Sequence, residues 1–255
     1  MTKIEKFLQR IGMNPDTKPV PNFEFLKNVQ YNAVISIAYE NLDILDKKPL
    51  KLDADSLFEK IDEKGRGGYC FEVNGLLSWF FKECGFEVTD YFARFLRGEK
   101  DIPMRRHRVL SVKCDDGDYF CDIGIGQIAP RLPVLMKEGL PQKQFGETYK
   151  FEKDKNLGWV LYDLHNGEWR QFISFTEEKI YEIDFVQPSV YCELHPDSVF
   201  NKAPMIAIKT PDGRKTIDDK TYKVFVGNEL AYIEENVSKE RFDELLIKEF
   251  NIICR

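Results

Sequence analysis

The sequence has few histidines, no paired cysteines and no long hydrophobic run. No apolar stretch approaches the roughly 20 residues of a membrane-spanning helix, and the first residues lack the hydrophobic core of a signal peptide. We therefore expect a cytoplasmic protein without a membrane partner. The 6 cysteines stand apart, with no CxxC spacing, which favours free thiols over a disulfide framework or a zinc site. Neither a Walker loop nor a dinucleotide fingerprint occurs, and we expect no bound metal.

The composition is that of an ordinary globular protein. The chain has 255 residues, of which 43% are hydrophobic and 31% charged, enough for a large core. Its net charge of -6 disfavours nucleic acid as the main partner. A local basic site for an anionic ligand stays compatible with this charge.

The pattern of apolar residues divides the chain into three parts. Helical spacing predominates in residues 1–85, alternating and β-branched segments in residues 86–175, and a mixture in residues 176–255. We expect helices over 22–41, 55–63 and 70–84, and strands over 86–96, 107–114, 119–123, 145–151, 159–164 and 168–175. In the third part we expect helical or irregular segments at 177–183 and 195–200, strands at 205–209 and 215–226, and a helix over 238–250.

Cys70 is the strongest candidate for chemistry. It opens a helix whose buried face is marked by Val73, Leu76, Leu77, Phe80 and Phe81. Free backbone N–H groups and the helix dipole favour a thiolate at this position. Gly67 and Gly68, just before it, permit a tight turn and close approach by a ligand. A catalytic nucleophile and an inert, buried packing residue are both consistent with this segment alone.

A thiol nucleophile needs a base and a group that orients the base. His107 opens one strand of a predicted hairpin and Asp122 ends the other. With Asp116 and Gly117 at the turn, Asp122 faces Ser111, on the same side of the sheet as His107 but about 13 Å from it along the strand. Contact therefore requires a slipped register, a bulge or strong twist. The other two histidines are weaker candidates, since His165 lies beside a turn and His195 precedes Pro196.

Basic residues gather around His107 on this acidic chain. They offer a rim for the phosphates of an anionic cofactor, although a solvated strand face explains any one of them equally well. The two glycines after Asp122, Gly124 and Gly126, can cradle a phosphate or form an ordinary turn. The basic residues are Arg94, Arg97, Lys100, Arg105, Arg106 and Arg108.

Several segments together resemble the arylamine N-acetyltransferase family. RGGYCFEVNG at 66–75 is similar to the family's nucleophile motif, and HRVL at 107–110 and DIGIG at 122–126 are similar to its histidine and aspartate segments. The order along the chain is the same. ENLD at 40–43, PDSVF at 196–200 and Ala203-Pro204 extend the resemblance over residues 20 to 230.

The resemblance implies a fold and an activity. The fold is α+β, with an N-terminal helical bundle, a central antiparallel β-barrel, a C-terminal α/β lid and a cysteine-proteinase-like Cys–His–Asp core. The activity is transfer of an acetyl group from acetyl-CoA to an arylamine, arylhydrazine or N-hydroxyarylamine, through an acetyl-cysteine intermediate. A homodimer is possible.

The resemblance also implies roles for residues of this chain. Cys70 is the nucleophile, His107 the base and Asp122 the orienting carboxylate. The family's usual Pro-Phe before Glu-Asn-Leu is Ala38-Tyr39 here, and its aromatic between the two glycines is Ile125, so the acceptor preference is open. The expected acceptor wall is Tyr39, Phe71 and Ile125, and the expected coenzyme A contacts are Pro103, Met104, Arg105, Arg106, Gly124, Gly126 and Ser198.

Two alternatives remain open. One is a transglutaminase-like or papain-like thiol enzyme that hydrolyses amides and uses no coenzyme A. The other is a binding module in which Cys70 merely fills space.

Overall fold

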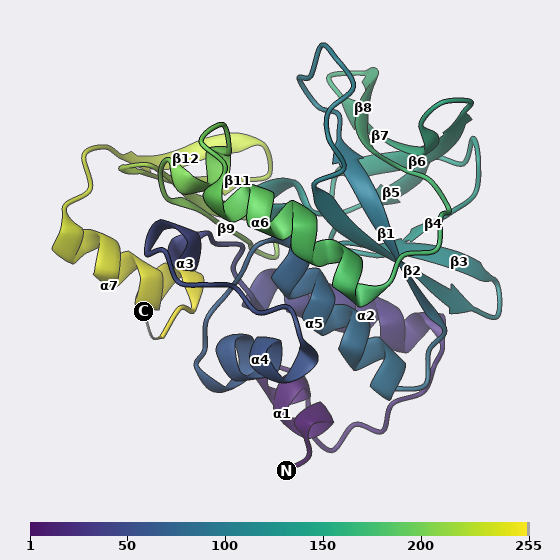
Figure 1. The fold of residues 1–255 in the computed structure, drawn as a ribbon, viewed down its shortest axis with the longest axis horizontal. Helices are drawn as coiled ribbons and strands as arrows, with labels where there is room; N and C mark the ends of the chain where they lie inside the picture. Colours follow the sequence, from purple (N-terminus) through teal and green to yellow (C-terminus); the bar gives the residue numbers. More distant parts are fainter. Residues whose placement is uncertain (254–255) are drawn as a thin grey trace.

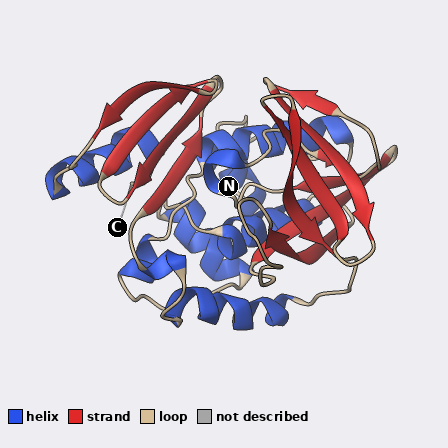
Figure 2. Cartoon of the chain, turned by 90° about the horizontal axis from the view of Figure 1, so that it is seen from above, coloured by secondary structure: helices blue, strands red, loops and turns tan. Residues whose placement is uncertain are grey.

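The computed structural model describes residues 1–253. Helices lead to a strongly curved sheet, and a second, smaller sheet packs with the last helix on the other side of the molecule (Figures 1 and 2). This arrangement is α+β, as expected. The N-terminal elements are α1 (Lys3–Arg10), α2 (Phe23–Ser36), α3 (Leu42–Leu45), α4 (Ala54–Phe58), the π-helical turn η1 (Glu59–Glu63) and α5 (Cys70–Glu83).

Helix α5 forms the centre of the first part. The Glu72 carboxylate accepts a hydrogen bond from the backbone N–H of Tyr69 and so caps the first turn. Gly85, with φ of +87°, follows the end of the helix. Most of α5 is buried, because α1, α2 and α4 cover one side and strands β2 and β3 the other. The first residue of α5, Cys70, is therefore held from several directions.

The middle of the chain forms one antiparallel sheet of eight strands, in the order β4-β3-β2-β1-β8-β7-β6-β5. The sheet curls into a nearly closed barrel around an apolar interior. Side-chain amides bridge its two edges, since Gln142 bonds to the backbone of Leu135 and Gln144 to that of Leu132. The elements are β1 (Val88–Phe95), β2 (His107–Cys114), β3 (Gly117–Cys121), η2 (Gly126–Ile128), β4 (Val134–Leu135), β5 (Gln142–Gln144), β6 (Glu147–Asp154), β7 (Gly158–His165) and β8 (Glu168–Phe175).

The last part contains two separate packing units. Helix α6 lies against the start of α5, where Phe185 and Cys192 share a core with Tyr69, Cys70 and Phe71. The four-stranded sheet β12-β11-β10-β9 packs instead with α7 and with Ala38 and Leu42. The elements are η3 (Glu182–Phe185), α6 (Val186–Leu194), η4 (Val199–Asn201), β9 (Met205–Lys209), β10 (Gly213–Asp218), β11 (Thr221–Val226), β12 (Glu229–Glu234) and α7 (Lys239–Phe250).

The structure differs from the sequence-based expectations in several elements. The helix predicted over 22–41 ends at Ser36, because residues 38–40 pair as extended backbone with Gly68 and Ala207. The strand predicted over 215–226 is two strands joined by a turn at Asp219, which has φ of +52°. Helix α6 and strand β12 were not predicted, since α6 contains Pro188 and neither segment has a clear apolar period.

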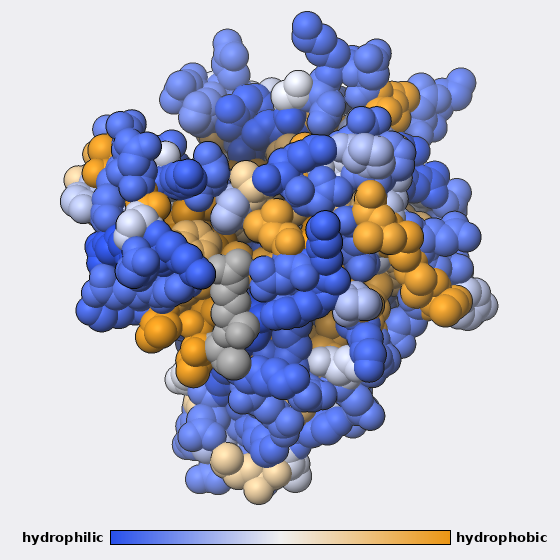
Figure 3. Space-filling view, turned by 60° about the vertical axis from the view of Figure 1, so that its left-hand side comes forward, coloured by the Kyte–Doolittle hydropathy of each residue, from blue (hydrophilic) through white to orange (hydrophobic). Residues whose placement is uncertain are grey.

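The surface is mainly hydrophilic on the face shown in Figure 3, and its hydrophobic residues gather in separate patches. Within residues 1–253, no helix has the length and apolar character needed to cross a bilayer.

Candidate active site

Cys70 occupies the first position of α5 and lies at the edge of a cavity. Its side chain is 1% exposed, and its Sγ lies 3.7 Å from the backbone carbonyl oxygen of Arg106, to which a thiol donates. A neutral thiol therefore fits this contact better than a thiolate. The location at a helix start agrees with the prediction, but the surroundings of the sulfur are more enclosed than the sequence suggested.

The hairpin that carries His107 and Asp122 has a different register from the predicted one. Cys114 pairs with Gly117, so the turn is Asp115-Asp116, one residue earlier than expected. Leu110 faces Cys121, and continuing this register places Asp122 opposite Val109 rather than Ser111. The offset from His107 is thereby halved while both side chains stay on one face, because a shift of two residues preserves the alternation.

The His107 ring is bonded to the Asp122 carboxylate. The distance from His107 Nε2 to Asp122 Oδ2 is 2.6 Å, and Asp122 is 0% exposed. Engagement of Nε2 leaves Nδ1 as the ring nitrogen that can exchange a proton with a ligand or the thiol. His107 and Cys70 both line the cavity, so the imidazole and the thiol face the same space.

Asn74, one helical turn after Cys70, joins the nucleophile helix to the hairpin. Its Nδ2 donates to Asp122 Oδ1 at 2.8 Å and to the carbonyl of Arg108 at 2.6 Å, and its Oδ1 accepts from the N–H of Ile123 at 3.0 Å. Asn74 was not among the predicted site residues. Its i+4 spacing from Cys70 could have signalled that both residues lie on one helix face.

Burial disfavours the charged form of the Cys70 sulfur. Burial raises the pKa of the Cys70 thiol well above its usual range, and the neighbouring Cys192 sulfur acts in the same direction. Backbone groups of Arg108 and Phe71 lower that pKa, and the Asp122 carboxylate raises it further. Desolvation therefore opposes the thiolate that the free N–H groups at the helix start favour, and the expected thiolate stays a prediction.

Gly124 lets the hairpin approach α5 closely. A Cβ at this position would lie 2.6 Å from Cys70 Cα and 2.8 Å from Asn74 Nδ2. The Gly124 N–H donates to Asp122 Oδ1 at 2.8 Å. Lack of a side chain at Gly124 thus allows the orienting carboxylate to reach the nucleophile helix.

Buried ion pairs hold the loop before Cys70. Arg66 donates to Glu40 at 2.7 Å and contacts Asp43 at 3.1 Å, while Lys60 contacts Glu72 at 2.7 Å. A Cβ at Gly67 would lie 2.0 Å from the carbonyl oxygen of Ala38, so the backbone at Gly67 is in direct contact with the backbone at Ala38. The ENLD and RGGYC segments are therefore parts of one support for the nucleophile.

The cavity beside Cys70 has a volume of about 380 Å³ and draws on all three parts of the chain. Tyr39 and Cys70 come from the first part, the loops around 103–107 and 124–128 from the barrel, and η4, β9 and β10 from the last part. It is lined by Tyr39, Cys70, Phe95, Glu99, Pro103, Met104, Arg106, His107, Gly124, Ile125, Gly126, Gln127, Ile128, Val199, Phe200, Met205, Ile206, Ala207, Thr216 and Asp218.

Most of the predicted binding residues lie on this wall, but three do not. Phe71 is fully buried and packs against Tyr69 and Phe185. The Ser198 hydroxyl is buried and donates to the carbonyl of Cys192. Arg105 forms an ion pair with Glu178. Tyr39, Ile125, Pro103, Met104, Arg106, Gly124 and Gly126 line the cavity.

The basic residues near His107 separate into paired and unpaired groups. Arg108 is buried and bonded to Asp90, Arg97 pairs with Asp163, and Arg94 donates to the carbonyl of Pro103. Arg106 makes no ion pair within residues 1–253, and its guanidinium lies 5.9 Å from the Tyr191 ring. Arg106 is thus the arginine of this group with a charge available to the cavity.

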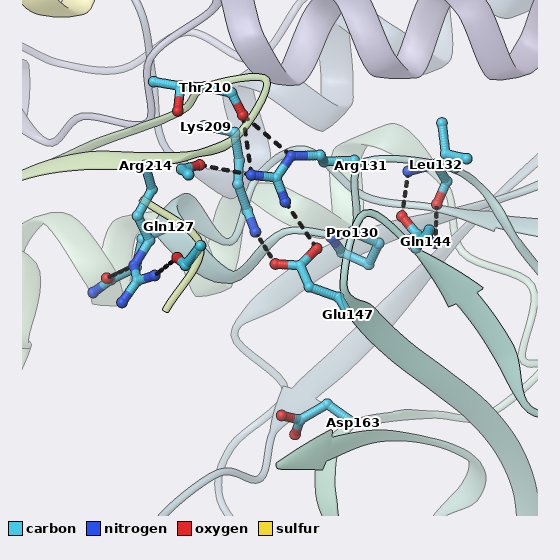
Figure 4. A network of polar contacts seen from close by, with 12 residues as sticks. Gln127, Pro130, Arg131, Leu132, Gln144, Glu147, Asp163, Lys209, Thr210 and Arg214 are labelled. Carbon is cyan, nitrogen blue, oxygen red and sulfur yellow. Dashed lines mark hydrogen bonds and ion pairs between the residues drawn. The ribbon is translucent and has the colours of Figure 1, made fainter. Parts of the chain in front are cut away.

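A second polar network fixes part of the wall. Arg214 donates to Gln127 Oε1 at 2.9 Å, which leaves the Gln127 amide N–H groups for other partners (Figure 4). Beside it, Lys209 and Arg131 share the carboxylate of Glu147, and Arg131 also bonds to the carbonyl of Thr210 (Figure 4). These bonds connect the barrel to the four-stranded sheet.

Comparisons with known proteins find relatives over most of the chain. A profile of the N-acetyltransferase family matches residues 22–255. The arylamine N-acetyltransferase of Mycolicibacterium smegmatis is 31% identical over 246 residues, covering 94% of this chain and 88% of the relative. A solved structure of an M. smegmatis arylamine N-acetyltransferase superposes with a TM-score of 0.91 at 30% identity, covering 99% of this chain and 93% of that one.

Further similarities extend to enteric bacteria and other mycobacteria. A Salmonella typhimurium structure has a TM-score of 0.93 at 24% identity, over 99% of this chain and 92% of that one, and supports the fold. A Mycobacterium marinum arylamine N-acetyltransferase, solved in complex with CoA, has a TM-score of 0.91 at 26% identity, over 98% of this chain and 93% of that one.

The fold and the family match define an acyltransferase. In this chain a thiol at a helix start and a histidine bonded to a carboxylate line one cavity. The family match and the M. smegmatis relative place the chain more closely. It belongs to the arylamine N-acetyltransferase family.

Proposed function

We propose that this protein transfers an acetyl group from acetyl-CoA to an aromatic amine, arylhydrazine or N-hydroxyarylamine through acetylated Cys70. The observation that carries the proposal is the convergence of Cys70 and His107 on one cavity, with His107 Nε2 bonded to Asp122 at 2.6 Å. The M. marinum relative in complex with CoA supports the donor, and a Salmonella relative named also as an N-hydroxyarylamine O-acetyltransferase supports the acceptor range.

In the first half-reaction, Cys70 Sγ attacks the acetyl carbonyl carbon as its proton passes to His107 Nδ1. The bond to the coenzyme sulfur then breaks, and the departing sulfur takes that proton. Burial raises the pKa of the Cys70 thiol, so His107 is needed to take its proton for the sulfur to attack. Thioester exchange is nearly balanced in energy, so positioning supplies most of the acceleration.

In the second half-reaction, the acceptor nitrogen, or the oxygen of an N-hydroxyarylamine, attacks the acetyl carbon. His107 takes the acceptor's proton and returns it to the Cys70 sulfur as the thioester breaks. Free backbone N–H groups in the first turn of α5 are the nearest donors for the oxyanion of each step. Asp122 holds the ring and stabilises the imidazolium that forms.

The residues on the wall divide between the two substrates. Arg106, with no ion pair among the described residues, suits a phosphate of coenzyme A, and Pro103, Met104, Gly124 and Gly126 line the same space. Tyr39 and Ile125 suit an aromatic acceptor close to Cys70. Phe71 and Ser198 support this wall from behind rather than touching a ligand.

Intact-protein mass spectrometry after brief exposure to acetyl-CoA, without acceptor, tests the proposal. We expect one added acetyl group, mapped to Cys70, that disappears when an arylamine is added. Cys70→Ala is the matched control. An unmodified protein that instead releases ammonia from a glutamyl amide would replace acyl transfer with amide hydrolysis.

A further inference from the structure

Strand β10 places two polar side chains on the cavity wall. Thr216 and Asp218 line the cavity and alternate with Ile217, which lies in the core shared with α7. Their antiparallel partners on β9, Ala207 and Met205, line the same cavity. The two polar groups therefore lie side by side on one face, opposite the barrel loops.

The Thr216 hydroxyl lacks a partner. Thr216 is 1% exposed, and its Oγ1 is buried without a hydrogen bond to any of residues 1–253. Thr216 pairs with Ala207 on one side and Lys223 on the other, so its backbone lies inside the sheet. The side-chain hydroxyl is the polar group of Thr216 that has no hydrogen-bond partner. A buried hydroxyl without a partner is costly unless a ligand supplies one.

The Asp218 carboxylate is similarly available. It is exposed at the cavity mouth, and neither an ion pair nor a hydrogen bond reaches it from the described part of the chain. Partial desolvation raises the pKa of the Asp218 carboxyl, and the positive charge of Lys223 acts in the opposite direction. An ionised carboxylate accepts hydrogen bonds and donates none, so the group it suits is an N–H or O–H donor.

We infer that Thr216 and Asp218 form a subsite that accepts a hydrogen bond from an N–H or O–H group of a ligand bound beside Cys70. The inference rests on the proposed function and specifies the chemistry of its substrates. Two substrates carry such donors: the amides and hydroxyl of the pantetheine arm of acetyl-CoA, and a donor substituent on the acceptor. A carboxylated acceptor is disfavoured at this end of the cavity by the charge of Asp218.

Four variants test the subsite. Thr216→Val removes the hydroxyl at nearly constant volume, Thr216→Ser retains it, and Asp218→Asn removes the charge. Asp219→Asn is the matched control, because Asp219 does not line the cavity and asparagine tolerates its left-handed backbone. Kinetics use acetyl-CoA with two acceptors, 4-methylaniline and 4-(aminomethyl)aniline, of which the second alone carries a distal donor.

The two possible hydrogen-bond donors, the pantetheine arm and the acceptor substituent, predict different kinetic results. If the pantetheine arm is the donor, Thr216→Val raises the KM for acetyl-CoA by about 3- to 10-fold with either acceptor, and Thr216→Ser does not. If the acceptor is the donor, Asp218→Asn lowers kcat/KM by about 10-fold or more for 4-(aminomethyl)aniline alone. Parameters unchanged from those of Asp219→Asn in both arms overturn the inference.

A separate readout distinguishes this inference from the proposed function. Calorimetric binding of coenzyme A and of each amine is measured on the Cys70→Ala background, where no turnover occurs. If wild type forms no acetyl-Cys70, the proposed function fails, and the same calorimetric comparison still decides the subsite. If acetyl-Cys70 forms but neither Thr216→Val nor Asp218→Asn weakens binding, the subsite alone is refuted.

Discussion

At the scale of single residues, the site depends on how Asp122 is bonded. Its Oδ2 contacts His107, and its Oδ1 receives Asn74 and the N–H of Gly124. All of these groups are buried, so water cannot replace a lost bond. Substitutions at Asp122 and Asn74 therefore separate orientation of the base from assembly of the site.

Asp122→Asn keeps the shape of the side chain and removes its charge. We expect kcat to fall by about 10³- to 10⁴-fold, because an amide stabilises neither the required tautomer nor the imidazolium. Steady-state kinetics with circular dichroism as the folding control measure this effect. A fall of less than tenfold would mean that Asp122 does not orient the base.

Asn74→Ala removes three buried hydrogen bonds at once. We expect a loss of about 2–3 kcal/mol in the free energy of unfolding, since buried donors and acceptors lose their partners. We also expect slower alkylation of Cys70, because the hairpin is no longer held to α5. Denaturant titration and iodoacetamide kinetics test both effects, with Asn32→Ala on the surface of α2 as control. Equal behaviour of the two variants would argue against this role.

At the scale of elements, the β2–β3 hairpin must lie directly against α5. The hairpin contacts α5 at Gly124, and the lack of a Cβ there permits the short distance between the two elements. Gly124→Ala should reduce kcat by roughly 100-fold or more, since a misplacement near 1 Å can cost that much. Gly139→Ala controls for backbone strain away from the site, because its Cβ would meet nothing within 4 Å while its φ of +73° disfavours a side chain. Retention of acetyl-Cys70 formation at the wild-type rate in Gly124→Ala would contradict this account.

The elements also show where sequence reasoning succeeded. The α5 helix has a clear apolar period and β2 was predicted at its observed bounds, because such patterns are local. The second hairpin strand, predicted over 119–123, begins and ends two residues earlier. The register was wrong, because two acidic residues and a glycine allow more than one turn and only packing selects among them. Helix α6 was missed since its stability comes from packing against Tyr69 and Cys70 rather than from its own pattern.

At the scale of the whole molecule, a buried charge cluster joins the barrel to the four-stranded sheet. Lys209 of β9 is 2% exposed and contacts Glu147 of β6, which Arg131 also contacts at 3.1 Å (Figure 4). Burial lowers the pKa of Lys209 to about 8, and the pull of Glu147 in the opposite direction does not offset it. Two cations thus share one carboxylate.

The lowered pKa of Lys209 predicts how stability changes with pH. Between pH 8 and the ordinary lysine value of 10.5, the unfolded chain binds this proton and the folded chain does not, so the group adds stability as pH rises. We expect wild type to gain about 2–3 kcal/mol over Lys209→Met from pH 7 to pH 10.5. At pH 7, Lys209→Met should be at least as stable as wild type, because Arg131 still pairs with Glu147.

Denaturant titrations of both proteins at pH 7, 8, 9 and 10.5 test this expectation. Glu147→Gln is the companion variant, and at pH 7 it should lose about 3–5 kcal/mol because two cations remain without their carboxylate. A constant difference between wild type and Lys209→Met across this range would show that Lys209 keeps its ordinary pKa in the fold. The proposed homodimer stays a prediction at this scale.

The sequence by itself singled out Cys70, His107 and Asp122, because each stands in a short motif whose local structure places it at the start or end of an element. Only the tertiary structure decided the burial of Cys70, which residues line the cavity, and the availability of Thr216 and Asp218. These properties depend on desolvation and on contacts between segments more than 100 residues apart, such as Tyr39 with Ala207. Local patterns carry no information on which distant surfaces will exclude water from a site.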